Sequence, residues 1–111
     1  MIRLLVALFF ALTSNFVHAE TIKCFISVNA ERVVETEFSV LPGNKELFAD
    51  SGDYRFFMKN FDHSKFELEV YDVYAPSRSY STGFLRTSED ELAWAFWSRD
   101  VLIETTCKLI Q

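Results

Sequence analysis

The chain of 111 residues is poor in the side chains on which most metal-binding and catalytic chemistry depends. It has two histidines and two cysteines, too few for the common zinc sites, in which these residues supply most of the ligands. Its 11 cations stand against 16 acidic side chains, so the net charge is −5. Nucleic-acid binding requires clustered cations. Neither a nucleic-acid partner nor a metal or other cofactor is therefore expected.

Glycine and proline are also scarce, with three and two residues, which excludes a flexible linker. The N-terminal apolar run, Leu4–Leu12, is shorter than the roughly 20 residues that cross a bilayer. Arg3 precedes this run and Val17-His18-Ala19 follows it, which is the layout of a secretory signal peptide. We expect cleavage after Ala19 and a single domain at residues 20–111 without a membrane span. An uncleaved anchor or a buried helix is the alternative.

The two cysteines, Cys24 and Cys107, stand near the two ends of the expected mature domain. An even number of cysteines in a short exported chain predicts a disulfide, and two cysteines allow a single intramolecular pairing. A free thiol or an intermolecular bridge is the alternative. Loss of Arg3 with the leader changes the net charge from −5 to −6, which suits solubility or a basic partner. The expected location is therefore periplasmic or extracellular.

Alternation of apolar and polar residues dominates the mature sequence and predicts short β-strands joined by tight turns. The expected strands are Ile22–Val28, Val33–Val40, the short and ambiguous Lys45–Asp50, Tyr54–Asn60, Lys65–Tyr74, Ser79–Arg86, Glu91–Ser98 and Val101–Ile110. This pattern predicts an all-β fold, a small antiparallel meander of seven or eight strands that closes as a barrel or a sandwich. Both cysteines fall at inward positions, so the disulfide would tie the first strand to the last.

One segment, "SEDELAWAFWSR", fits two structures. Ser88 and Glu91 have the spacing of a helix capping box. The apolar residues after them are continuous and show no helical stripe, however, and two Trp and a Phe favour a pleated surface. We predict a strand with Leu92, Trp94 and Phe96 directed inward.

Polar motifs in the chain give little support for catalysis. "DHS" contains the residue types of a hydrolase triad, but three consecutive residues in a tight turn cannot align as triads do, so we interpret it as a polar hairpin turn. The acidic clusters "DSGD" and "EDE" lack the spacing of a calcium loop. Four glutamates at alternate strand positions are interpreted as solubilising charges rather than a catalytic pair: Glu35, Glu37, Glu67 and Glu69.

Aromatic residues and arginine gather around one turn, in "VYDVYAPSRSYSTGF". Tyr74 and Tyr80 bracket Arg78, and these residue types carry most binding hot spots. Trp97 and Arg99 add to this set if Trp97 faces outward from the next hairpin. The sequence therefore predicts a binding surface formed by these five residues, with Arg78 as its polar anchor.

A second turn, "SGDY", contains Ser51, Asp53 and Tyr54. With an early and a late cysteine in an exported chain, it resembles the periplasmic inhibitors of c-type lysozyme, which are small antiparallel β-barrels with a Ser-Gly-x-x-Tyr signature. The resemblance implies that Ser51 reaches toward the lysozyme active site. Tyr54 stands one residue earlier than the signature requires. These three residues form an alternative binding site.

We conclude from the sequence that the protein is an exported, non-catalytic binding module whose partner is a protein or a component of the cell envelope. Three alternatives remain at this point. They are a lysozyme inhibitor, a carrier of small apolar ligands if the fold is hollow, and a hydrolase that uses surface carboxylates.

Overall fold

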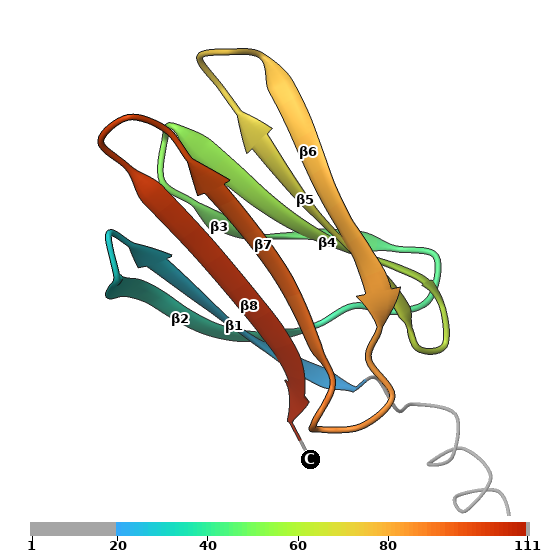
Figure 1. The fold of residues 1–111 in the computed structure, drawn as a ribbon. Coiled ribbons are helices and arrows are strands. Elements are labelled where there is room, and N and C mark those ends of the chain that lie inside the picture. Colours follow the sequence, from blue (N-terminus) through green and yellow to red (C-terminus); the bar gives the residue numbers. More distant parts are fainter. Residues whose placement is uncertain (1–19, 111) are drawn as a thin grey trace, which may run out of the picture.

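The computed structural model describes residues 20–110, which form eight β-strands (Figure 1). They are β1 (Thr21–Val28), β2 (Glu31–Ser39), β3 (Lys45–Asp50), β4 (Tyr54–Asp62), β5 (Lys65–Asp72), β6 (Ser77–Phe84), β7 (Glu91–Trp97) and β8 (Leu102–Ile110). The predicted signal peptide, residues 1–19, lies outside the described residues. Across the described part of the chain, no helix is long and apolar enough to cross a membrane.

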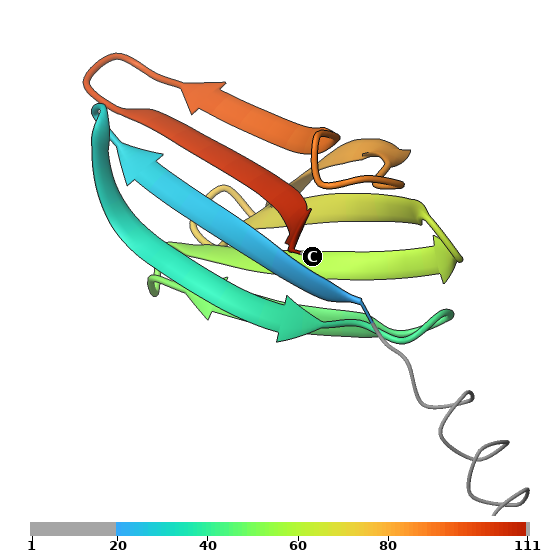
Figure 2. The ribbon, with the colours of Figure 1, turned by 90° about the horizontal axis from the view of Figure 1, so that it is seen from below.

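The strands form two four-stranded antiparallel sheets that lie face to face as two layers (Figure 2). Sheet A has the order β2-β1-β8-β7 and sheet B the order β3-β4-β5-β6. The chain crosses from sheet A to sheet B after β2 and returns after β6. This is the strand order of a meander, but no hydrogen-bonded ladder joins β2 to β3 or β6 to β7 in residues 20–110. The all-β prediction is confirmed, and the two sheets form a sandwich without closing into a barrel.

The core lies between the inner faces of the two sheets, where the alternation of the sequence directs its apolar side chains. On β7 the predicted inward positions are confirmed, since Leu92 and Trp94 are buried and Phe96 is half-buried, whereas Ala93 and Trp97 are exposed. The capping-box spacing before this segment therefore does not produce a helix. The largest fully buried side chains include Ile22, Met58, Phe66, Leu68 and Leu85.

The two sheets adjoin without a ladder at two places, between β2 and β3 and between β6 and β7, which we call seams. Different contacts hold the two seams together. At the β6–β7 seam, Trp94 Nε1 donates to Ser79 Oγ at 2.9 Å, and Ser81 Oγ donates to the carbonyl of Ala93 at 2.7 Å. At the β2–β3 seam, the rings of Phe38 and Phe48 stack with their centroids 4.8 Å apart. The first seam is therefore bonded by polar contacts from both strands, whereas the second relies on an aromatic stack.

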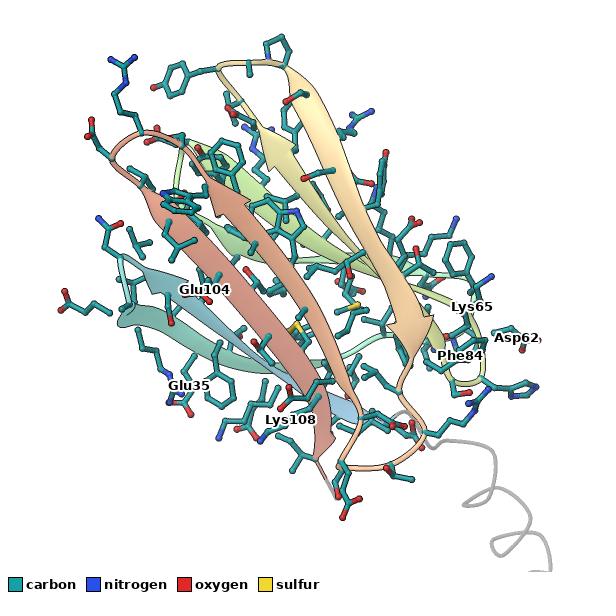
Figure 3. The ribbon with its side chains drawn as sticks, in the orientation of Figure 1. Glu35, Asp62, Lys65, Phe84, Glu104 and Lys108 are labelled. Atoms are coloured by element: carbon teal, nitrogen blue, oxygen red, sulfur yellow. A yellow bond between two sulfur atoms is a disulfide. The ribbon has the colours of Figure 1, made fainter. Side chains whose placement is uncertain are left out.

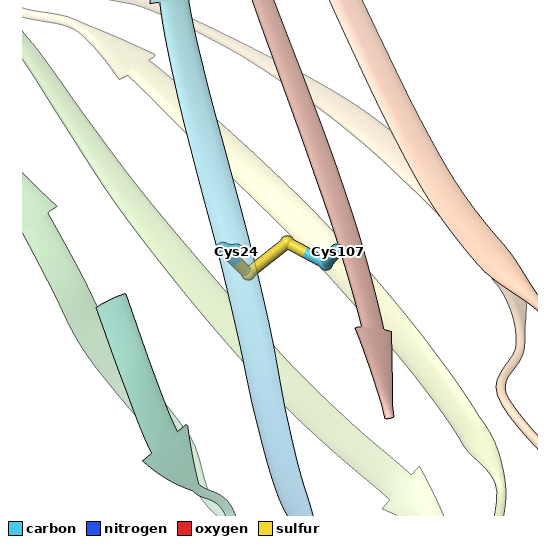
Figure 4. The surroundings of a disulfide bond; sticks show 2 residues. All are labelled: Cys24 and Cys107. Carbon is cyan, nitrogen blue, oxygen red and sulfur yellow. A yellow bond between two sulfur atoms is a disulfide. The ribbon is translucent and has the colours of Figure 1, made fainter. Parts of the chain in front are cut away.

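The disulfide joins Cys24 on β1 to Cys107 on β8 (Figure 4). The two residues are direct partners in the antiparallel ladder, and both are fully buried. The predicted link between the first and last strands is confirmed. The bond therefore joins the N-terminal pair of strands in sheet A, β1 and β2, to the C-terminal pair, β7 and β8.

The structure corrects the predicted boundaries around the Tyr74–Tyr80 segment. β5 ends at Asp72 and β6 begins at Ser77, so Arg78 is not in the turn but pairs with Tyr71 in the β5–β6 ladder. The sequence correctly predicts a break at Pro76, but it extends this break to Arg78, which belongs to β6. Pro76 lies in the turn, where its missing N–H costs no ladder hydrogen bond.

The β1–β2 turn has left-handed backbone at both central residues, with φ of 52° at Asn29 and 67° at Ala30. Two-residue turns of this kind favour Asn-Gly, because a Cβ is disfavoured at positive φ. Replacement of Ala30 by Gly is expected to raise the free energy of unfolding by about 0.5–1 kcal/mol, or the melting temperature by a few degrees. Calorimetric melting of the two proteins tests this, and a lower melting temperature for Ala30→Gly would contradict the turn geometry.

Candidate functional site

Most of the candidate residues lie at or near one end of the sandwich, on more than one face. The turns that follow β1, β3, β5 and β7 all lie at this end, which we call the hairpin end (Figure 1). The opposite end, the crossover end, contains the two connections between the sheets and the β4–β5 turn. Tyr74 lies in the β5–β6 turn, Arg99 in the β7–β8 turn and Ser51 in the β3–β4 turn.

Arg78 lies on the outer face of sheet B, where neighbouring residues hold its guanidinium in place. Arg78 Nε is 3.5 Å from a carboxylate oxygen of Glu69, and the guanidinium lies 5.2 Å from the centre of the Tyr71 ring. Its side chain is still 60% exposed. Tyr80, which is 53% exposed, lies two residues further along the same face of β6. The result is an oriented cation beside an accessible aromatic ring.

The carboxylate of Glu69 is the centre of this arrangement, which the sequence analysis missed. Its side chain is 7% exposed, although it points away from the core, and Lys45 Nζ bonds it at 2.6 Å. Glu69 was interpreted as a solubilising charge, and this is wrong. The alternation places Glu69 on the outer face correctly, but only strand pairing brings Lys45 of β3 and Arg78 of β6 over it from both sides.

Trp97 and Arg99 lie apart from this group. Trp97 is 81% exposed at the end of β7 and faces outward from sheet A, as predicted, whereas Arg78 and Tyr80 face outward from sheet B. Tyr74, which is 79% exposed, lies in the β5–β6 turn at the hairpin end. A flat partner surface on the outer face of sheet B therefore reaches Arg78 and Tyr80 but not Trp97.

The alternative site adjoins the main one. The backbone N–H of Val73 donates to the carbonyl of Asp53 at 3.0 Å, which links the β5–β6 turn to the β3–β4 turn. Within its turn, Ser51 Oγ accepts from the N–H of Tyr54 at 3.1 Å and donates to the Tyr54 carbonyl at 3.3 Å. Gly52 has a φ of 91°, which only glycine adopts easily. The Ser51 hydroxyl thus stabilises the turn itself.

Tyr54 connects this turn to the interior. Its ring lies 6.1 Å from that of Phe96 across the two sheets. Burial, followed by the nearby charges of Asp72 and Asp53, raises the pKa of the Tyr54 hydroxyl. Tyr54 therefore remains a neutral hydrogen-bond donor at physiological pH.

An apolar cleft of about 100 Å³ opens beside Tyr54, between the sheets. Its walls include Val28, Val33, Val34 and Phe56. This volume accommodates a single side chain rather than a small-molecule ligand, whose pockets measure about 300–1,000 Å³. Two larger hollows, of about 310 and 320 Å³, lie on the surface at the crossover end and on the outer face of sheet A.

Two of the remaining carboxylates have a lowered pKa. A hydrogen bond from Lys23 and its charge lower the pKa of Glu35, and backbone N–H groups of Arg86 and Thr87 lower that of Asp90. A general acid at neutral pH needs the opposite shift. Asp62 contacts His63 at 3.2 Å in an exposed turn, as expected for a polar hairpin. No three potential metal ligands gather within residues 20–110.

Comparisons with known proteins identify no relative. No family model, no curated protein and no solved structure matches the chain.

Proposed function

We propose that the protein is an exported, non-catalytic binding module that uses the hairpin end of sheet B to hold a protein partner. The observation that supports this most strongly is the orientation of Arg78. Its guanidinium is fixed between Glu69 and Tyr71 and stays largely exposed. Fixing a flexible side chain before binding reduces the conformational entropy that association costs. Two exposed tyrosines, Tyr74 in the adjoining turn and Tyr80 on the same strand, add contact area with few rotatable bonds.

The substitution Arg78→Ala is expected to weaken partner binding by about 30-fold, or about 2 kcal/mol, as a central Arg anchor does. The partner is first captured from an envelope extract on the immobilised mature domain and then titrated calorimetrically. Arg78→Ala also removes a countercharge from the buried Glu69, so stability must be measured beside affinity. Arg78→Lys keeps the charge but loses the planar, multiply donating group. It is expected to retain stability and still lose most of the affinity.

Thr82→Ala is the matched control, because Thr82 lies on the same strand and the same face, away from the turn. It is expected to bind as the unmodified domain does. Lysozyme of the c-type is titrated as the first defined probe. Binding to lysozyme that depends on Ser51 and not on Arg78 would favour the inhibitor alternative. Equal affinities of the Arg78 variants and the unmodified domain would remove Arg78 from the site.

A further inference from the structure

The surface hollow of about 310 Å³ at the crossover end is built from segments that are far apart in the sequence. Glu20 before β1, the β2–β3 connection, the β4–β5 turn and the β6–β7 connection each contribute to its lining, and we call it the crossover hollow. Backbone hydrogen bonds tie these segments to one another. The N–H of Gly43 donates to the carbonyl of Asn60 at 2.7 Å, and the N–H of Leu85 donates to the carbonyl of Ser64 at 2.8 Å. The walls of the hollow are therefore held in place by the fold itself.

The lining includes Asn60, a polar side chain at a position where the alternation of β4 places core residues. Phe56 and Met58, which precede it on the same face, belong to the apolar core. Asn60 is 4% exposed, and its Nδ2 donates to the carbonyl of Val40 at 3.0 Å, but its Oδ1 has no hydrogen-bond partner within residues 20–110. The hydroxyl of Thr105 is also unpaired in this range, but Thr105 lines none of the hollows described above. A buried acceptor without a donor costs stability, so an unpaired one in the wall of a hollow favours a ligand that donates to it, directly or through one water.

The rest of the lining offers both donors and acceptors. Ser64 is half-buried in the β4–β5 turn beside the exposed His63, and either side chain can donate or accept. The guanidinium of Arg86 lies 4.2 Å from the centre of the Phe84 ring and forms no salt bridge within the described chain. Glu20 contributes a carboxylate, which accepts. The hollow therefore suits a ligand whose own groups donate and accept in equal measure.

The charges around the hollow nearly balance. Arg86 and Glu20 in the lining have opposite signs, and Asp90 lies beside Arg86, whose backbone N–H it accepts at 2.8 Å. Asp62 and Lys65, of opposite sign, are ladder partners at the end of the neighbouring β4–β5 hairpin (Figure 3). An anionic or a cationic ligand therefore gains little from the surrounding charges, which favours a neutral one.

We propose that the crossover hollow binds one unit of a neutral saccharide, such as the terminal unit of a glycan. A sugar hydroxyl both donates and accepts, as the hydroxyl of a side chain does, and this matches a lining of mixed donors and acceptors with balanced charge. Pro42, Phe66 and Leu85 form the apolar part of the wall, against which the C–H groups of a sugar ring can pack. The volume lies at the lower end of the range of small-molecule sites, about 300–1,000 Å³, as a ligand of one or two rings requires.

The test titrates the mature domain, residues 20–111, with glucose and with N-acetylglucosamine and follows the backbone amide signals by NMR. We expect saturable shifts of the signals of the residues that line the crossover hollow, with a Kd of about 1 mM for a ligand of this size. Glucuronate and glucosamine are the anionic and cationic counterparts, and neither is expected to bind more tightly than the neutral sugars.

Two variants remove the groups that carry the proposal. Ser64→Ala/Arg86→Gln removes a hydroxyl and a guanidinium from the lining and is expected to weaken sugar binding about tenfold. Asn60→Leu removes the unpaired acceptor and is expected to weaken it to a similar degree. Because Asn60→Leu also loses the bond to Val40, thermal melting verifies that it folds, and the first variant tests the site without this complication.

The matched control is Ser27→Ala/Arg32→Gln, which makes the same two changes in the hollow of about 320 Å³ on the outer face of sheet A. Among the described residues, the lining of that hollow contains no buried polar atom without a partner. This variant should bind sugar as the unmodified domain does. Equal loss in the two double variants, shifts confined to other surfaces, no saturable shift with either neutral sugar, or tighter binding of a charged sugar would overturn the proposal.

Discussion

Reduction of the Cys24–Cys107 disulfide is expected to lower the free energy of unfolding by about 2–5 kcal/mol. The bond spans 83 positions of the sequence, and the chain-entropy model gives about 4.5 kcal/mol for a loop of that size. A domain of this length has a small core relative to its surface, so this is a large part of its total stability. Urea unfolding of the oxidised and reduced protein measures the difference directly.

The double variant Cys24→Ala/Cys107→Ala removes the disulfide without a reductant, and it is compared with the reduced protein. Both side chains are fully buried, so replacing them also removes a little apolar volume from the core. The reduced protein keeps both sulfurs, and the two forms are expected to agree within about 1–2 kcal/mol. An unfolding free energy that is the same with and without reductant would show that the bond is not formed or does not constrain the unfolded chain.

Trp94→Ala is expected to lower the free energy of unfolding by about 3–5 kcal/mol, as removal of a large buried aromatic side chain does. The Trp94 ring packs edge-on against Phe56 of the opposite sheet and stacks with Phe96. Its indole N–H also bonds Ser79 across the β6–β7 seam. Trp94→Phe keeps most of the packing and loses the hydrogen bond, so we expect a smaller loss of about 1–2 kcal/mol.

Trp97→Ala is the matched control for Trp94→Ala, because it removes the same side chain from the same strand. Trp97 is 81% exposed, against 9% for Trp94, so its loss should change stability by less than about 0.5 kcal/mol. Urea unfolding of both variants measures the contrast. Equal losses would mean that the faces of β7 are assigned wrongly, since a slip of one residue exchanges them.

The alternation identifies β1, β4, β5, β7 and β8 most directly, because each of these strands buries one face in the core. This held even for β7, where the local capping-box spacing suggested a helix. The ends of strands depend on pairing with their neighbours, which the local sequence does not contain. Arg78 was assigned to a turn because Pro76 and serines surround it, whereas its pairing with Tyr71 depends on the whole β5–β6 ladder.

The candidate site could be predicted only where its residues are close together in the sequence. Tyr74, Arg78 and Tyr80 are close in sequence, so composition alone could group them. Lys45 and Glu69 come from two other strands, and their contact is set by the lateral order of sheet B. The separation of Trp97 from Arg78 arises in the same way, because it follows from the assignment of β6 and β7 to opposite sheets.

The unequal seams of the sandwich determine where the protein opens most readily. Polar bonds join β6 to β7, and the disulfide holds β1 to β8, so these four strands resist separation together. The β2–β3 side has half-exposed strands and one aromatic stack, and segments with few buried contacts unfold locally at the lowest free energy. The apolar cleft beside Tyr54 lies on this side. We therefore expect its volume to change with that local opening, and an apolar group that enters the sandwich to pass between β2 and β3.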